Sequence, residues 1–408
     1  MTMSRGPNAA AEYRAAARLL TEAAQGVTRT VQRMHRAIAR RPFGAFGVAA
    51  QPAKQWHDSI SELVYSSVLA GLTVGGALTE TAAHAVGSLR PSGSLVDSPA
   101  GGAAAGVLNG AFGERGYTAP PVMSLRVDGA AVPVDRASLT EAYPDAAGHI
   151  VLFLHGLIET ERWWYPRAPR EGRPARVDFG TRLATDLACT PLYVRYHSGR
   201  HISGNGRELD ELMSALVAEW PTKVERISII GHSLGGLVAR SAVHTGAVDQ
   251  SPWLSELAHV VCLGSPHTGA PLEFGAHLVS WTLRRFPESA PLGDLLELRS
   301  EGIKDLRYGY LHEEQWADRD PDVLLGRVKG IKAVVSPGVR QHFLSVTISR
   351  NRNGMLARFF GDALVTPTSS ADESQEALRH WLGGMHHFDL LRHDEVYRQL
   401  LAWLRTSD

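Results

Sequence analysis

Cysteine is scarce in this sequence, with two residues, Cys189 and Cys262, in a chain of 408. Two cysteines cannot supply the disulfide framework of a small secreted domain, and neither has neighbours at metal-ligand spacing. We therefore expect both thiols to be buried as small hydrophobic groups, with no metal site around them. The first 18 residues also lack the apolar core and cleavage site of a secretory signal peptide. Together these absences favour a reducing, cytoplasmic setting.

Net charge is also missing, because 42 Lys and Arg residues balance 42 Asp and Glu residues. A chain without net charge has no general attraction for nucleic acid, so we expect none as a partner. The balance hides a local excess of about +6 over residues 1–60. This excess comes from Arg5, Arg14, Arg18, Arg29, Arg33, Arg36, Arg40, Arg41 and Lys54 against Glu12, Glu22 and Asp58.

Residues 1–115 are predicted to form a helical N-terminal region. Apolar residues recur at spacings of three, four and seven over residues 9–41, and arginines fill the opposite arc. Residues 56–87 give a second helix that is unusually apolar. No charged residue lies between Glu62 and Glu80. Such a run, about 17 residues long, is at the lower limit for crossing a bilayer.

Two arrangements of these helices are open. In the one we expect, they pack as a buried hairpin joined by a linker from Pro42 to Pro52. In the other, their basic and apolar faces lie against a membrane or lipid surface, so that residues 1–90 make a peripheral membrane contact. Nothing in the sequence determines the oligomeric state.

Residues 116–408 alternate short apolar strands with helices, which is typical of a mostly parallel central sheet with helices on both faces. The expected strands are 124–127, 150–154, 192–196, 227–230, 260–263 and 343–348. The expected helices are 178–187, 206–219, 234–244 and 395–405, the second of them capped by Asn205. An insertion at about 268–340 is too long for a plain connection, so we expect a cap or lid there.

The rest of the chain is organised around residues 227–236, Ile-Ser-Ile-Ile-Gly-His-Ser-Leu-Gly-Gly. A buried strand breaks at Gly231 and a helix begins at Leu234, so Ser233 stands between glycines at a strand-to-helix turn. This is the G-x-S-x-G nucleophile elbow, in which a strained backbone makes the serine hydroxyl project from the sheet. Gly231 and Gly235 lack the Cβ atoms that would clash in so sharp a turn. The sequence therefore predicts that Ser233 is a catalytic nucleophile.

A second motif, His155-Gly156-Leu157, follows the apolar strand 150–154, and Ser-Pro-His-Thr-Gly follows the strand 260–263. With the elbow, these segments resemble the lipase and esterase branch of the α/β-hydrolase fold. The resemblance implies an oxyanion hole made by the backbone N–H groups of Leu234 and Leu157. Donors fixed on the backbone need no reorganisation when the tetrahedral intermediate forms. No cofactor is implied.

The same resemblance implies the rest of a Ser-His-Asp triad, in the chain order serine, acid, histidine. Residues 359–365 are similar to the family's Gly-Asp-Gly-x-Val loop, which makes Asp362 the acid, although Ala363 stands where glycine is commoner. His387 begins a His-Phe-Asp-Leu-Leu segment similar to the one before the family's last helix, and it is assigned as the general base. Its neighbour His386 is the alternative, because adjacent residues of an extended loop point in opposite directions.

Substrate contacts are predicted around this centre. His155 and His267 lie on segments that pass near it, and Phe274 and Leu278 belong to an apolar helix in the expected cap. An apolar cap suits a small-molecule ester or lipid with an apolar acyl chain, so lipase/esterase-like hydrolysis through an acyl-enzyme is the predicted reaction. The alternatives are an acyltransferase or thioesterase with the same triad, and a non-catalytic lipid-surface or scaffold protein.

Overall fold

A computed structural model describes most of the two regions that the sequence predicts. The described residues are 9–45, 51–88, 106, 122–165, 177–267, 301, 305, 311–313, 338–347 and 378–405. They belong to two compact units, one with the first two helices and one with the sheet. The predicted boundary at residues 115 and 116 and almost all of the predicted cap, 268–340, lie outside the described residues.

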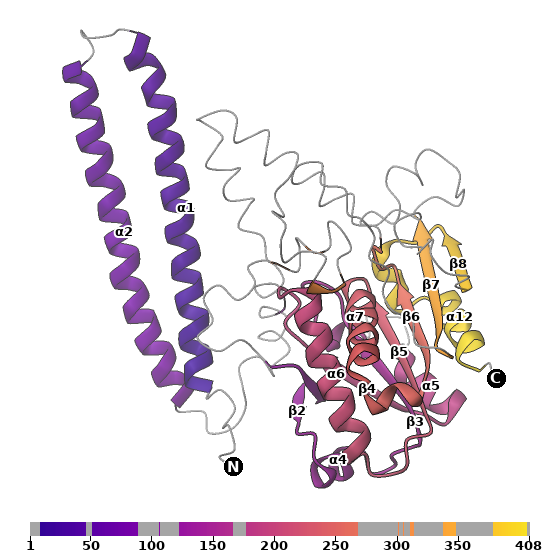
Figure 1. The fold of residues 1–408 in the computed structure, drawn as a ribbon. Helices are drawn as coiled ribbons and strands as arrows, with labels where there is room; N and C mark the ends of the chain where they lie inside the picture. Colours follow the sequence, from indigo (N-terminus) through magenta and orange to yellow (C-terminus); the bar gives the residue numbers. More distant parts are fainter. Residues whose placement is uncertain are drawn as a thin grey trace, which may run out of the picture. The chain divides into compact units, whose positions relative to one another are not determined.

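The helical unit contains an antiparallel pair, α1 (Ala9–Ala45) and α2 (Gln51–Ser88), as Figure 1 shows. Gln25 of α1 donates a hydrogen bond to Thr73 of α2, and Arg36 of α1 pairs with Glu62 of α2. Residue numbers thus rise along one helix as they fall along the other, and the predicted hairpin is confirmed. The predicted linker is wrong at both ends, because α1 continues to Ala45 and α2 begins before Pro52. Proline fits the first turn of a helix, where its missing N–H has no acceptor in any case.

The expectation that this hairpin is buried is wrong for α2. Only Ser61 and Gly76 of α2 are buried among the side chains that the structure describes, whereas Leu63 and Leu78 are each 67 % exposed. Within the part of the chain that the structure describes, α1 covers one side of α2 and leaves the other exposed. The apolar run between Glu62 and Glu80 therefore reflects an exposed face instead of a core.

The second unit is built on an eight-stranded sheet with the order β2-β1-β4-β3-β5-β6-β7-β8. Neighbouring strands from β4 to β8 pair in parallel, and β1 pairs antiparallel with both β2 and β4. The mostly parallel sheet predicted from the sequence is confirmed. The strands are β1 (Ser124–Val127), β2 (Ala130–Val132), β3 (His149–Leu154), β4 (Thr190–Arg195), β5 (Arg226–His232), β6 (Leu257–Leu263), β7 (Arg340–Thr347) and β8 (Leu378–Gly383).

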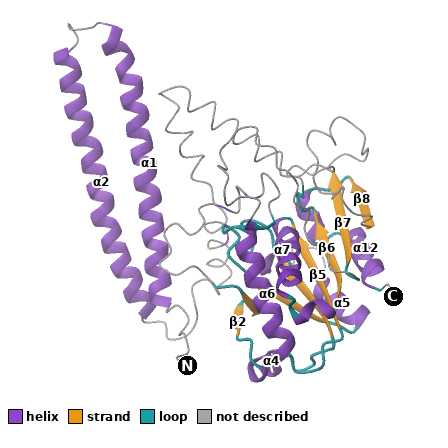
Figure 2. Cartoon of the chain, in the orientation of Figure 1, coloured by secondary structure: helices purple, strands orange, loops and turns teal. Residues whose placement is uncertain are grey.

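Helices cover both faces of this sheet, as expected (Figure 2). Helices α6 and α7 pack on the face that Ile150, Leu152 and Leu154 of β3 contribute, and α5 and α12 pack on the face of Val151 and Phe153. This alternation is the two-residue period of a strand buried on both sides. The helical elements are α4 (Arg136–Ala142), α5 (Phe179–Leu187), α6 (Ile202–Glu219), α7 (Leu234–Asp249), α12 (Asp394–Leu404) and the 3-10 turns η3 (Glu161–Trp163), η4 (Pro252–Ser255) and η6 (His387–Leu391).

Several local predictions need correction. Strands β2 and β8 were not expected, since the first has three residues and the second contains Arg379 and His380. Helix α6 begins at Ile202 and not at residue 206, so Asn205 does not cap it. Its amide instead donates to the carbonyl of His197. Both cysteines are buried and free of disulfides, as predicted.

Candidate active site

Ser233 occupies the turn between β5 and α7 with a backbone conformation of φ 51° and ψ −117°. A residue with a side chain rarely adopts positive φ, and such strain persists only where the surrounding structure holds it in place. Here the amide of Ser233 donates to the carbonyl of Leu263, at the end of the neighbouring strand β6, over 2.8 Å. Ser233 is half-buried, whereas His232 and Leu234 on either side are buried. The elbow thus presents the serine at the carboxyl edge of the sheet.

The glycines of the elbow are required by close backbone contacts. A Cβ on Gly231 would collide with the backbone of Gly235 and Gly236, and a Cβ on Gly235 would lie 2.6 Å from the carbonyl oxygens of Leu154 and His155. Helix α7 therefore packs directly against the turn and against the end of β3. This contact confirms the steric reason for the glycine spacing.

Backbone N–H groups of two segments lie at this end of the sheet. Leu234 is the first residue of α7, where N–H groups have no intrahelical acceptor and the helix dipole favours negative charge. Leu157 follows β3 and is half-buried. The next residue, Ile158, has φ 59°, and its amide donates to Ser198 Oγ over 3.3 Å. A β-branched residue at positive φ is a marked outlier, so this loop is held in a strained shape.

A buried carboxylate, Glu159, ties this loop to the elbow. Its Oε2 accepts a hydrogen bond from the amide of Gly156 over 2.6 Å and lies 3.0 Å from Nδ1 of His232. Glu159 is 2 % exposed and His232 is fully buried. Burial alone would raise the pKa of Glu159, but its contacts with His232 and Gly156 together hold that pKa below its ordinary value. The carboxylate is thus an acceptor, and His232 Nδ1 carries the proton between them.

His387 lies directly beside the elbow. It opens η6 after β8, and its side chain is 2 % exposed. Its ring centroid is 4.7 Å from that of His232, and its carbonyl oxygen is 3.4 Å from His232 Nε2. A Cβ on Gly264, the residue after β6, would lie 2.9 Å from Cε1 of the His387 ring. The Ser233 amide bonds to Leu263, the last residue of β6. The elbow and the ring of His387 therefore both lie beside the carboxyl end of β6.

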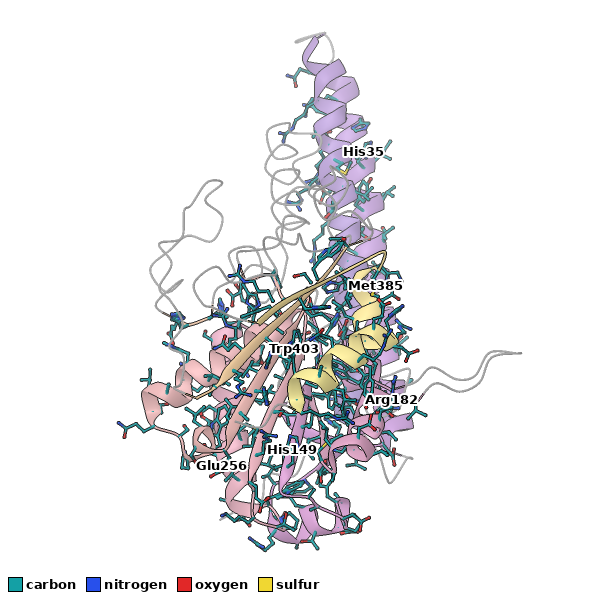
Figure 3. The ribbon with its side chains drawn as sticks, turned by 90° about the vertical axis from the view of Figure 1, so that its right-hand side faces the viewer. His35, His149, Arg182, Glu256, Met385 and Trp403 are labelled. Carbon is teal, nitrogen blue, oxygen red and sulfur yellow. The ribbon has the colours of Figure 1, made fainter. Side chains whose placement is uncertain are left out.

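The alternative base, His386, points elsewhere. Its side chain is 57 % exposed, and its Nε2 lies 3.3 Å from a carboxylate oxygen of Asp389. Asp389 also accepts the amide hydrogen of His386, which closes a capping box at the start of η6. Met385, labelled in Figure 3, precedes the pair and is buried. The two neighbouring histidines thus have opposite environments.

His155 is enclosed at the end of β3. Its ring stacks on Tyr196 with centroids 4.2 Å apart, its Nδ1 lies 2.8 Å from the carbonyl of Gly156, and its Nε2 accepts the Tyr196 amide hydrogen over 3.3 Å. Burial lowers the pKa of this histidine, so the neutral ring fits this pattern of one donor and one acceptor. These contacts shape the loop that carries Leu157. The predicted contact of His155 with substrate stays a prediction.

His267 ends the described part of the segment after β6. Its Nδ1 lies 2.9 Å from a guanidinium nitrogen of Arg240 on α7, and its ring meets the edge of Phe343 with centroids 4.7 Å apart. Three other predicted site residues, Phe274, Leu278 and Asp362, lie outside the described residues. Their roles remain predictions, as does that of His267 toward substrate.

Sequence reasoning missed Glu159 and the contact that it makes with His232. A glutamate two residues after the His-Gly-Leu motif looks like an ordinary surface residue in the sequence. Glu159 and His232 are 73 positions apart, so their contact gives no local signal. Glu161, two residues further, was missed for the same reason and forms a buried ion pair with Arg195, whose Nε lies 2.6 Å from Glu161 Oε2.

The family model described as "PGAP1-like alpha/beta domain" matches residues 205–289 of this chain. The match contains β5, the elbow, α7 and β6, together with most of α6. No curated protein matches the chain significantly.

Several solved structures of hydrolases are similar to the chain. The lipase BlEst2 of Bacillus licheniformis is 16 % identical, with 62 % of this chain and 91 % of that one covered and a TM-score of 0.39. Phospholipase PlaB of Legionella pneumophila is 15 % identical, with 64 % and 60 % covered and a TM-score of 0.40. The Pyrococcus furiosus esterase Pf2001 is 12 % identical, with 64 % and 82 % covered and a TM-score of 0.34. Identities this low say nothing about the chemistry of this chain.

The fold assignment therefore depends on features of the chain itself. The strands β4-β3-β5-β6-β7-β8 run in parallel, helices cover both faces, and a strained serine stands between β5 and α7. The family model matches the segment that contains this serine. These features confirm that the chain has the α/β-hydrolase fold that the sequence predicts.

Proposed function

We propose that this protein is a serine hydrolase that cleaves carboxylic esters through an acyl-enzyme. Ser233 is the nucleophile, and His387 is the general base that takes its proton and later gives it to the leaving alcohol. A neutral imidazole can do both near pH 7. Asp362 is the carboxylate that orients the imidazole. Among the described carboxylates near the site, Glu159 faces His232 and Asp389 faces His386, so neither replaces Asp362 in this proposal.

The oxyanion of the tetrahedral intermediate would be stabilised by the N–H groups of Leu234 and Leu157. The first belongs to the start of α7, and the second to the loop that Glu159 anchors through Gly156. Loss of one such donor in other enzymes lowers kcat about 10²–10³-fold. Water then attacks the acyl group on Ser233, with His387 acting again as the base.

The observation that carries this proposal is the strained backbone of Ser233 beside the buried ring of His387. Folding by itself does not require a serine at φ 51°, since glycine would occupy that conformation without strain. A buried histidine against the end of the neighbouring strand supplies the base that such a serine needs. We extend the proposal to esters with apolar acyl chains, on the ground of the apolar residues Phe274 and Leu278 in the predicted cap.

A Ser233→Ala variant tests the nucleophile. We expect hydrolysis of p-nitrophenyl esters to fall by several orders of magnitude, because removal of the nucleophile in another serine hydrolase lowers kcat about 10⁶-fold. A fluorophosphonate probe should label Ser233 of the wild type, as located by mass spectrometry. Ser255→Ala, an exposed serine on η4, is the matched control and should keep full activity. Unchanged hydrolysis by Ser233→Ala would refute the mechanism.

Product analysis separates hydrolysis from the two catalytic alternatives. The wild type is incubated with an ester and an added alcohol, and separately with an acyl thioester. Free acid as the main product supports ester hydrolysis. A new ester with the added alcohol would favour an acyltransferase, and faster cleavage of the thioester would favour a thioesterase.

A further inference from the structure

Helix α2 exposes a continuous apolar face. Six large apolar side chains of this helix are 46–67 % exposed. At about 100° per residue, they fall within one arc of about 140° that does not include the buried Ser61 and Gly76. They are Ile60, Leu63, Val64, Val68, Val74 and Leu78. Soluble proteins rarely leave so many large apolar groups side by side without a partner.

This face is also free of charge. The 17 residues between Glu62 and Glu80 contain no charged side chain and span about 26 Å of helix. Over His57–Ala82 the helix is apolar and long enough to cross a membrane, with a mean hydropathy of 1.3, and only 6 % of its most apolar window is buried inside the protein. Length and composition therefore allow this helix to contact lipid.

Five hydroxyl groups on α2 are bonded to the backbone of the same helix. Ser67 donates to the carbonyl of Leu63 over 2.7 Å, and Thr73 donates to the carbonyl of Leu69 over 2.8 Å. Thr79 donates to the carbonyl of Gly75 in the same way. In hydrocarbon, polar groups need partners within the protein because water is absent. These five hydroxyls have such partners, so the cost of moving them into lipid is reduced.

The companion helix α1 excludes a simple crossing of the bilayer by the hairpin. It runs alongside the uncharged stretch of α2, with Gln25 bonded to Thr73, and its Arg29 and Arg33 are exposed there. Arginine side chains in the middle of a bilayer are costly. A hairpin with one apolar and one charged helix instead suits the interface, where the apolar face enters the acyl region and the charged helix stays among headgroups and water.

Charge favours a lipid surface over a second copy of this hairpin. Helix α1 contains seven arginines and two glutamates, Arg14, Arg18, Arg29, Arg33, Arg36, Arg40 and Arg41 against Glu12 and Glu22. Two such helices would repel each other, whereas an anionic bilayer attracts each basic side chain near its surface. We propose that α2 inserts its exposed apolar face into the surface of an anionic lipid bilayer, with α1 lying over it. This proposal does not depend on the chemistry of Ser233.

The test measures sedimentation of the full-length protein with phosphatidylcholine vesicles that contain phosphatidylglycerol. We expect a Leu63→Ser, Leu78→Ser double variant to bind at least about a hundredfold more weakly, because each lost leucine removes roughly a tenfold factor in partitioning. Val248→Ser is the matched control, since Val248 on α7 is 63 % exposed and lies outside the helical unit. It should bind as the wild type does. Circular dichroism of each variant checks that the helices are kept.

A second pair of measurements separates the two helices. Arg29→Gln with Arg40→Gln should weaken binding several-fold to the anionic vesicles and leave binding to pure phosphatidylcholine unchanged. Ser233→Ala should bind vesicles like the wild type, so a failure of the proposed hydrolase does not affect this test. Equal binding by the wild type and the double leucine variant would overturn the proposal. So would a wild-type dimer without vesicle binding that the leucine substitutions convert to a monomer.

Discussion

Replacement of Glu159 by glutamine should damage both stability and catalysis, because one buried oxygen of this side chain bonds to two parts of the site. Glu159 Oε2 accepts from Gly156 and from His232, at 2.6 and 3.0 Å. Glutamine keeps the shape of the side chain but loses its charge. Removal of one member of a buried pair costs about 3–5 kcal/mol, since the other member stays buried without compensation. This is a large fraction of a typical folding free energy of about 5–15 kcal/mol.

The catalytic effect follows from the loop that Glu159 anchors. A neutral amide in place of the carboxylate weakens the bonds to Gly156 and His232, so the strained segment that carries Leu157 can relax and the proposed second oxyanion donor can shift. We expect kcat to fall about 10²–10³-fold with little change in KM, since the donor acts mainly on the transition state. The assays are urea unfolding and steady-state hydrolysis of a p-nitrophenyl ester.

Glu161→Gln is the matched control for this prediction. Glu161 is fully buried and paired with Arg195, but it contacts neither Gly156 nor His232 in the described part of the chain. The Glu161→Gln substitution should lower the urea midpoint about as much as Glu159→Gln does, and it should leave kcat near the wild-type value. If Glu159→Gln and Glu161→Gln reduced kcat equally, the specific link from Glu159 to the oxyanion loop would be refuted.

Two further predictions concern histidines. Replacement of His387 by alanine should abolish ester hydrolysis, whereas the His386→Ala variant should keep most of the activity. The reverse result in the same assay would identify His386 as the general base. The His342 ring lies beside His259 and stacks on Trp403, the latter labelled in Figure 3. Burial lowers the pKa of His342 to about 3. The unfolded chain therefore binds more protons below about pH 6.5, and stability falls by up to about 1.4 kcal/mol per pH unit toward pH 3. In His342→Gln this acid slope of the urea midpoint should be shallower, and an identical slope would contradict the assignment.

Much of the sheet and the elbow could be predicted from local sequence. The strand before Ser233, the glycines around it and the helix after it are encoded within ten residues, because both the strain and its relief by glycine are local. The central parallel strands β3, β5 and β6 were recognisable because they are buried on both faces and therefore mostly apolar. The short β2 and the polar β8 lack that pattern, and their pairing depends on strands distant in sequence.

The sequence alone determined that this chain has an α/β-hydrolase fold with a serine at a strained turn and two histidines before the last helix. Only the tertiary structure decided which histidine is buried beside that turn, since neighbouring side chains differ through what packs against them. It also brought Glu159 to His232 across 73 residues, a contact without local periodicity. In the same way, the uncharged stretch of α2 could be interpreted as core or as surface until the exposure of its described side chains was known. Whether a residue is buried depends on the whole folded chain. An apolar pattern shows only that moving that surface out of water lowers the free energy.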